Sequence, residues 1–262
     1  IFNRILPAAV KAYDDDRFYW SSSPNAINYT TQYITDKRSG DAHYWGVWWG
    51  KDPFEKFNDN ISPSTSEDGR SSIPELATVE RYALPADYDI ESEVMKAHQR
   101  SSIGNTTIAH YMKDMFTVPA KFEDFLYVGQ LLQSEGIKMA IEAHRRAMPF
   151  CMGTLFWQID DCWPVASWSS IDYYGRWKAQ QYMAKKAFEP VIISPFREGD
   201  AIKIYTVSDL YENSSAILQI SLMDFEGKVL RKEEKTIVVP PNTSTVVYSL
   251  AEADWTKNID RT

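Results

Sequence analysis

The sequence has few of the features that mark membrane, metal and cofactor proteins. Its apolar runs fall short of the roughly 20 residues that a membrane-spanning helix needs, which argues against a membrane partner. It contains no metal-ligand spacing, no glycine-rich phosphate loop and no serine nucleophile elbow, so we expect neither a metal nor another cofactor. Only two of its 262 residues are cysteines, Cys151 and Cys162, and their apolar surroundings favour buried thiols over a disulfide.

Basic residues are also scarce. The 28 lysines and arginines are outnumbered by 36 aspartates and glutamates, which gives a formal net charge of -8. Because nucleic-acid binding relies on basic side chains that neutralise phosphates, we expect no nucleic-acid partner. Aromatic residues, in contrast, are abundant: they make up 14% of the chain, with 9 Trp and 15 Tyr. Flat rings on a concave surface can stack against sugars, although large aromatic side chains are more often simply buried.

Hydrophobic periodicity divides the chain into two parts. Up to about residue 190, amphipathic helical patterns at 122–147 and 175–188 flank an apolar run at 150–159 that is typical of a parallel strand buried on both faces. The first helix is expected to break near Gly136. After Pro195, short runs rich in Ile, Val, Thr and Tyr alternate with turn signals and predict an antiparallel sandwich, too short for the usual seven strands.

Candidate site residues occur in four stretches, FYWSSSPNA (18–26), GDAHYWGVWWGKDPF (40–54), STSEDG (64–69) and GTLFWQIDDCWPVASWSSIDYYGRWKA (153–179). Glu67 could attack a sugar, but a glutamate beside Asp and Gly in a serine-rich segment is more often a solvated turn. The tryptophans could stack on a sugar or fill a core, and His43 could bind hydroxyls or be structural. Asp160 and Asp161 could orient a substrate or, more simply, cap the next segment.

These stretches occur together with IPELATVERY, HQRSSIGN and FLYVGQLLQSEGIKMAIEAHRR. In this order they resemble the C-terminal part of the β-mannosidases of glycoside hydrolase family two. Their sequences are more similar to the bacterial branch of that family than to the animal one. The resemblance implies an α/β plus all-β fold: residues 1–192 would form the C-terminal portion of a (β/α)8 TIM barrel. Residues 193–262 would form an immunoglobulin-like β-sandwich, possibly truncated. The chain is thus expected to be the later part of a longer protein.

The resemblance also implies an activity. Family members are retaining hydrolases that remove terminal β-mannose from the non-reducing end of mannosides. The nucleophile of the family carries over onto Glu67 and a wall of the mannose subsite onto Trp157. A less certain binding role falls to His43, Trp48 and Trp49. The expected partner is a mannoside or manno-oligosaccharide, and a homo-oligomer is possible. The similarity to bacterial relatives suggests an exported, periplasmic protein.

Several residues depart from the family pattern. Relatives usually carry an aromatic residue where this chain has Asp68, an apolar one at Arg70 and Gln at Ser71. Pro63 is unusual as well, and a buried strand would not readily accommodate these changes, which predicts that the segment leaves the barrel.

The family's acid/base is a Glu directly after an Asn, and the sequence contains no Asn-Glu pair. We therefore expect this chain to be inactive by itself. The alternatives are a non-catalytic carbohydrate-binding or structural domain, and a family two exo-glycosidase of the β-galactosidase, β-glucuronidase or exo-glucosaminidase type.

Overall fold

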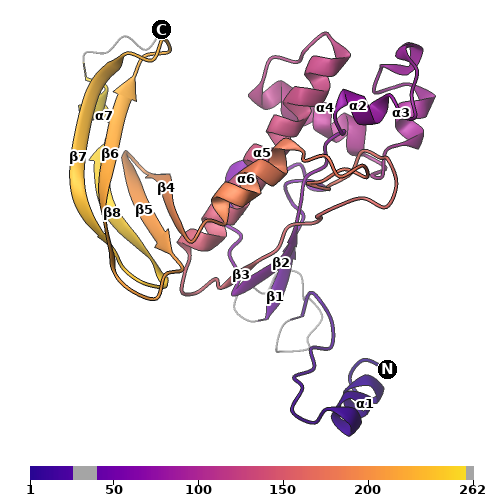
Figure 1. Ribbon diagram of the computed structural model, residues 1–262, viewed down its shortest axis with the longest axis horizontal. Helices are drawn as coiled ribbons and strands as arrows, with labels where there is room; N and C mark the ends of the chain where they lie inside the picture. Colours follow the sequence, from indigo (N-terminus) through magenta and orange to yellow (C-terminus); the bar gives the residue numbers. More distant parts are fainter. Residues whose placement is uncertain (26–39, 258–262) are drawn as a thin grey trace. The chain divides into compact units, whose positions relative to one another are not determined.

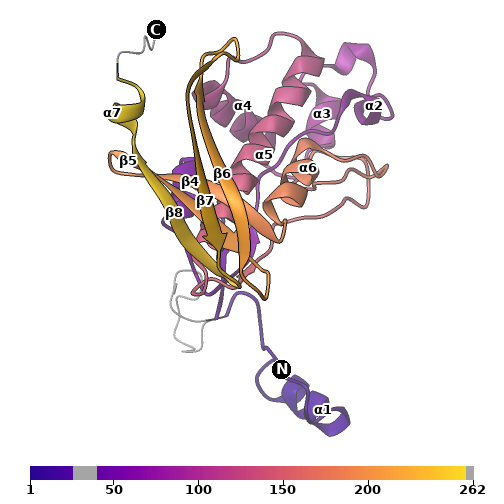
Figure 2. The same cartoon turned by 60° about the vertical axis from the view of Figure 1, so that its left-hand side comes forward.

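The computed structural model describes residues 1–25 and 40–257, which fall into two compact units (Figures 1 and 2). The first unit comprises Ile1–His144 and Phe150–Lys185, and the second comprises Arg145–Pro149 and Lys186–Thr262. In the described parts of the chain, no helix combines the length and the apolar character needed to cross a bilayer.

The first unit contains a parallel sheet of β1 (Asp41–Tyr44), β2 (Ser64–Asp68) and β3 (Gly153–Thr154), with β2 in the middle. The segment around Glu67, which was expected to leave the barrel, is the middle strand of this sheet. Pro63 lies just before β2, where its missing N–H interrupts no ladder bond, and its carbonyl accepts a hydrogen bond of 2.9 Å from the Met152 amide. The apolar run at 150–159 is strand only at Gly153–Thr154.

The helices of this part of the chain range from 4 to 25 residues in length. Those that precede β4 are α1 (Ile5–Tyr13), α2 (Leu76–Val79), α3 (Glu93–Ala97), α4 (Gly104–Met115), α5 (Phe122–Arg146) and α6 (Ala179–Ala187), with 3-10 turns at Phe54–Asn58 and Pro85–Asp87. The predicted break at Gly136 is absent, because α5 continues through it. A Cβ at Gly136 would lie 2.5 Å from Cδ of Arg70, so glycine provides the space that the buried arginine occupies.

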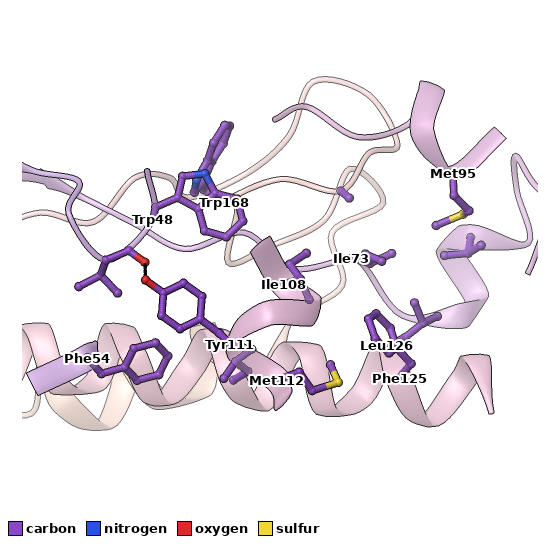
Figure 3. Packing of buried hydrophobic residues seen from close by; sticks show 14 of the residues in the cluster. Trp48, Phe54, Ile73, Met95, Ile108, Tyr111, Met112, Phe125, Leu126 and Trp168 are labelled. Carbon is purple, nitrogen blue, oxygen red and sulfur yellow. Dashed lines mark hydrogen bonds between the residues drawn. The ribbon is translucent and has the colours of Figure 1, made fainter. Parts of the chain in front are cut away.

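The core of the first unit is formed where α4 packs against α5 (Figure 3). Ile108 and Met112 of α4 lie among Leu126 and Leu132 of α5, all at most 2% exposed. The hydroxyl of Tyr111 donates to the carbonyl of Val47 and, at 2.6 Å, to that of Asp52. The turn that follows β1 is thereby fixed to α4.

The second unit consists of two antiparallel sheets. One contains β4 (Val191–Glu198), β5 (Ala201–Ser208) and β8 (Thr243–Ala251), and the other contains β6 (Ser214–Met223) and β7 (Val229–Val239); α7 (Glu252–Trp255) follows β8. Apolar side chains from both sheets form one cluster, centred on Ile204, Leu218, Ile237 and Val239. Burial of alternate residues on facing sheets produces a β-sandwich, as the short runs after Pro195 predict.

Candidate active site

A bulge in β2 determines which side chains face the candidate site. Ala42 pairs with Thr65, but His43 pairs with Glu67, so Ser66 is an extra residue on β2. Thr65 and Asp68 are buried, whereas the two residues between them are only half-buried. The extra residue therefore turns Ser66 and Glu67 toward the same side, which a regular strand with its alternating faces would not do.

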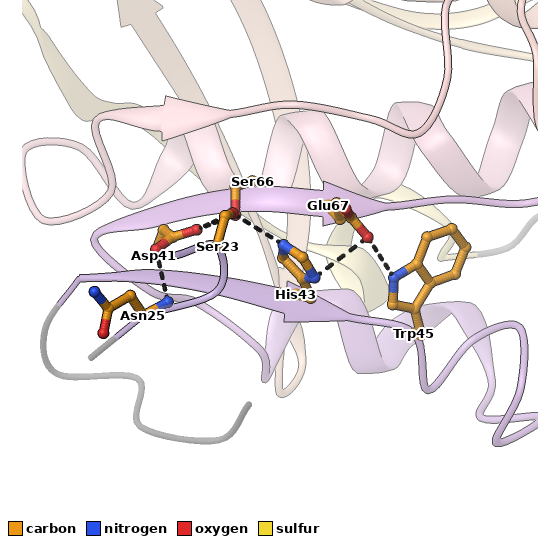
Figure 4. Close-up of polar contacts among 7 residues, drawn as sticks. All are labelled: Ser23, Asn25, Asp41, His43, Trp45, Ser66 and Glu67. Carbon is orange, nitrogen blue, oxygen red and sulfur yellow. Dashed lines mark hydrogen bonds and ion pairs between the residues drawn. The ribbon is translucent and has the colours of Figure 1, made fainter. Parts of the chain in front are cut away.

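Glu67 is held by two neighbours from the first strand and its continuation (Figure 4). Its Oε2 accepts a hydrogen bond of 3.1 Å from Nε1 of Trp45 and lies 3.2 Å from Nδ1 of His43. The carboxylate side chain is 28% exposed and the His43 side chain 14%. Among the described residues, both nitrogen neighbours of the partly accessible carboxylate contact Oε2.

The far side of His43 contacts a second polar group, centred on Asp41 (Figure 4). Oδ2 of Asp41 accepts hydrogen bonds of 2.5 Å from both Ser23 and Ser66, and Oδ1 accepts from the Trp20 indole at 2.9 Å and the Asn25 amide at 2.8 Å. Burial would raise the pKa of Asp41, but these four hydrogen bonds together outweigh it and lower the pKa. Asp41 is thus ionised at neutral pH.

Asp68 points to the opposite face of β2. Its side chain is 1% exposed, and neither carboxyl oxygen has a hydrogen-bond partner among the described residues. Nδ1 of His144 lies 3.9 Å away, but the same nitrogen is engaged with Oγ1 of Thr154 at 2.8 Å. Burial raises the pKa of Asp68 to about 8, so this carboxyl group is protonated at neutral pH.

Arg70 is fully buried among aromatic rings. The centre of its guanidinium lies 4.0 Å from the ring centroid of Tyr111, 4.4 Å from that of Phe54 and 5.9 Å from that of Trp48. None of its nitrogens has a geometrically acceptable hydrogen bond in the described structure. Burial lowers the pKa of Arg70 to about 9. Cation–π contacts offset only part of the loss of hydration.

A pocket of about 650 Å³ lies beside the end of β2. Aromatic side chains dominate its lining, which comprises Trp45, Trp49, Trp157, Trp163, Trp168, Arg100, Ser102, Gln158, Asp161, Cys162 and Val165. The Trp157 amide donates to the Asp68 carbonyl at 2.7 Å, and a Cβ at Gly69 would lie 2.6 Å from the Trp157 carbonyl oxygen and 2.8 Å from Trp45. The glycine after the strand therefore lets the pocket wall approach the Glu67 segment.

The structure brings together most of the side chains that the sequence singled out. Glu67 contacts His43, and the pocket lining includes Trp49 and Trp157, which are 49% and 43% exposed. Trp48, in contrast, is completely buried in the core against Trp168 and Arg70, away from any surface that a sugar could reach.

Some pocket and network residues escape sequence reasoning. Arg100 lines the pocket from a segment that was not singled out for binding, whereas Trp168 and Ser23 lie in candidate stretches but were not themselves named as binding residues. Cys162 is exposed, so the expectation that both thiols are buried is wrong for this one. In the portion of the chain that the structure describes, no group of His, Cys, Asp and Glu is arranged to bind a metal ion.

Comparison with known proteins shows similarity to β-mannosidases. Residues 200–262 match the family model described as a mannosidase Ig/CBM-like domain. The chain is 30% identical over 234 residues to the β-mannosidase of Capra hircus, covering 82% of this chain and 26% of that protein. It is 25% identical over 269 residues to β-mannosidase B of Aspergillus terreus, covering 94% of this chain and 32% of that protein.

A solved structure agrees with these matches. The crystal structure of the β-D-mannosidase from Dictyoglomus thermophilum superposes with a TM-score of 0.90 at 28% identity, covering 99% of this chain and 31% of that one. The chain thus spans from about a quarter to about a third of the length of these relatives. The sandwich of the second unit is of the immunoglobulin-like type, in agreement with the family match.

Proposed function

We propose, from the premise that this chain is a homologue of the β-mannosidases of glycoside hydrolase family two, that it forms part of a retaining exo-β-mannosidase in which Glu67 is the nucleophile. The observation that carries the proposal is the position of Glu67, which contacts His43 and Trp45 at the edge of a tryptophan-lined pocket. A retaining glycosidase needs a carboxylate aimed at the anomeric carbon and a surface that holds the sugar ring. Glu67 and the indoles of Trp49 and Trp157 supply these two parts.

The chemistry of Glu67 follows from its contacts. The nitrogen neighbours on Oε2 fix the orientation of the carboxylate. Oε1 would then attack the anomeric carbon of a terminal mannose and form a covalent glycosyl-enzyme, which water hydrolyses in the second step. Trp48, which is completely buried, would support the core beneath the site.

We further propose that residues 1–192 belong to a (β/α)8 barrel and residues 193–262 to a separate sandwich domain. In support, β1, β2 and β3 are parallel neighbours, and helices including α5 lie between β2 and β3 in the sequence. Strands connected through helices are the repeating unit of such barrels, whose active sites lie at the carboxyl ends of the strands. Glu67 is the penultimate residue of β2, in keeping with that rule.

The second carboxyl group required for retention would come from another segment of the full-length protein. Asp161 also lines the pocket, but its two oxygens accept hydrogen bonds from Ser167 at 2.7 Å and Ser169 at 2.5 Å, so it organises the surrounding loop. Proton donation to the leaving group is typically worth about 10²- to 10⁴-fold in rate. The 262-residue chain should therefore lack measurable turnover of an aryl β-mannoside.

The test uses the full-length protein that carries this chain. We expect Glu67→Gln to reduce hydrolysis of an aryl β-mannoside by on the order of 10³-fold or more, because the nucleophile is lost. The control is Glu91→Gln, which changes a side chain that is 58% exposed. A 2-deoxy-2-fluoro-mannosyl fluoride, whose fluoride leaves without protonation, should form an adduct on Glu67. Retained activity in Glu67→Gln, or an adduct on another residue, would contradict the assignment.

A non-catalytic carbohydrate-binding domain is the second candidate. The specific observation in its favour is the pair of buried ionisable groups, Asp68 and Arg70, directly after Glu67. Mannoside titration followed by tryptophan fluorescence distinguishes the two functions when it is done on this chain and on the full-length protein. A binding domain would bind mannoside in both and turn over in neither, whereas the enzyme needs the full-length protein for turnover.

A further inference from the structure

We infer that His43 is held as an imidazolium that donates from both ring nitrogens, to Glu67 on one side and to Ser23 on the other. The ring connects the candidate nucleophile to the Asp41 cluster (Figure 4). Its charge state follows from counting the protons available to each contact. The count depends only on the side chains present and not on the identity of a substrate.

Nε2 of His43 contacts Ser23, whose hydroxyl proton is used elsewhere. Ser23 Oγ donates to Oδ2 of Asp41 at 2.5 Å, and Ser66 Oγ donates to the same oxygen at 2.5 Å. A hydroxyl has a single proton, so both protons are committed to the carboxylate at 2.5 Å, and the longer contact of 3.1 Å between Ser23 Oγ and Ser66 Oγ has no proton of its own. Ser23 Oγ can therefore only accept in its contact of 3.1 Å with Nε2 of His43, and the proton in that contact must come from the ring.

Nδ1 of His43 faces the candidate nucleophile. It lies 3.2 Å from Oε2 of Glu67, the oxygen that also accepts a hydrogen bond from the indole N–H of Trp45. An ionised carboxylate can only accept, so this contact also requires a ring proton. A neutral imidazole has one N–H and would place a nitrogen lone pair against an oxygen lone pair on one side. Both contacts are satisfied at once only by the doubly protonated ring.

The charges around the ring favour the same state. Glu67 faces it from β2, and Asp41 faces it from β1 through Ser23. Two carboxylates beside one imidazole stabilise the charged ring. The hydrogen bonds that lower the pKa of Asp41 keep that group ionised, so it does not supply the missing proton.

The consequence is a positioning role, which rests on the proposed nucleophile. An imidazolium fixed at its far side by Ser23 holds Oε2 of Glu67 in place and keeps the carboxylate ionised. It cannot act as a base, because it has no free lone pair. Loss of one ring proton would break one of the two contacts and release either the Glu67 carboxylate or the Asp41 cluster. The orientation of Glu67 is thereby tied to the charge of His43.

The experiment is a long-range proton–nitrogen correlation spectrum of this chain labelled with nitrogen-15 at histidine, recorded at pH 7. There are four histidines, and His43→Gln identifies the signals of His43. We expect two protonated ring nitrogens in the unmodified chain. Ser23→Ala should cause loss of this pattern in favour of the neutral Nδ1–H form. Ser66→Ala is the matched control, because the described contacts of Ser66 are to Asp41 and Ser23 and include none to His43, and it should preserve the imidazolium.

A neutral His43 in the unmodified chain at pH 7 would overturn the inference, including the case in which Glu67 carries the proton. Equal effects of Ser23→Ala and Ser66→Ala would overturn it as well. Amide spectra of each variant verify that the fold is preserved. Since no substrate is present, the outcome is independent of mannosidase activity. A doubly protonated His43 beside a Glu67 that never forms a glycosyl adduct would refute the proposed function alone.

Discussion

Replacement of Asp68 by asparagine should make the first unit more stable, by an amount that grows with pH. The carboxyl group is buried without a hydrogen-bond partner in the described structure, and burial raises its pKa to about 8. In the unfolded chain an aspartate has a pKa of about 3.9. Between these values the folded protein retains a proton that the unfolded chain has lost.

The sign and size of the effect follow from this difference. A carboxyl group with a raised pKa in the folded state contributes its full stability below the unfolded value and loses it as pH rises toward the folded value. The slope is about 1.4 kcal/mol per pH unit, so the free energy of unfolding should fall by about 3 kcal/mol from pH 5 to pH 7 on account of Asp68. Asparagine does not ionise, so the gap between Asp68→Asn and the unmodified chain should widen by that amount.

Urea denaturation at pH 5, 6 and 7, followed by tryptophan fluorescence, measures the effect. Of the nine tryptophans only Trp255 belongs to the second unit, so the signal reports mainly on the first. Thr65→Val is the control, because Thr65 is a buried neighbour on the same strand and should change stability equally at each pH. If Asp68 is instead ionised and paired with His144, 3.9 Å away, Asp68→Asn would be destabilising at pH 7, and the reasoning from burial would be refuted.

Three further predictions concern neighbouring residues. Arg70→Met should raise the free energy of unfolding by about 1–3 kcal/mol in the same urea assay, because it removes a buried charge without hydrogen bonds, and a loss of stability would contradict this. Gly69→Ala should lower it by about 1–3 kcal/mol, since the new Cβ would lie 2.6 Å from the Trp157 carbonyl oxygen; Gly129→Ala, whose Cβ would have no neighbour closer than 3.7 Å, is the control and should not be destabilising. Trp157→Ala should weaken mannoside binding by the full-length protein about tenfold, as loss of a stacking ring does, and unchanged affinity in a calorimetric titration would remove Trp157 from the site.

The strands of the second unit and the long helix α5 are predictable from the sequence, because their patterns are long and regular. Runs of β-branched residues between turn signals identify β5 to β8, and apolar residues at helical spacing identify α5. The continuity of α5 at Gly136 is not predictable, since it depends on Arg70, a residue distant in sequence whose side chain occupies the space beside the glycine.

The parallel sheet of the first unit escapes prediction for a different reason. β3 is only two residues long, and β2 consists of Ser, Thr, Glu and Asp, which locally favour a turn. Glu67 emerges as a nucleophile candidate only through the resemblance of its surroundings to a family. Trp48 and Trp49 are adjacent and chemically identical, and only the turn that follows β1 buries one and exposes the other. Ser23 lies in a stretch that the sequence singles out, but its own role is not predictable there, because that role arises from contact with Asp41 and His43.

The bulge in β2 predicts where a one-residue deletion among related sequences would be tolerated. Ser66 is the extra residue, and Thr65 and Asp68 lie on the buried face on either side of the pair that it forms with Glu67. A chain shortened by one residue at Ser66 would regain ordinary alternation with Glu67 and Asp68 on their present faces. It would lose one hydroxyl, which donates to Asp41 and lies 3.1 Å from Ser23 Oγ. When this segment is aligned with a relative that is one residue shorter here, the gap belongs at Ser66, and the Glu67 carboxylate keeps its place across it.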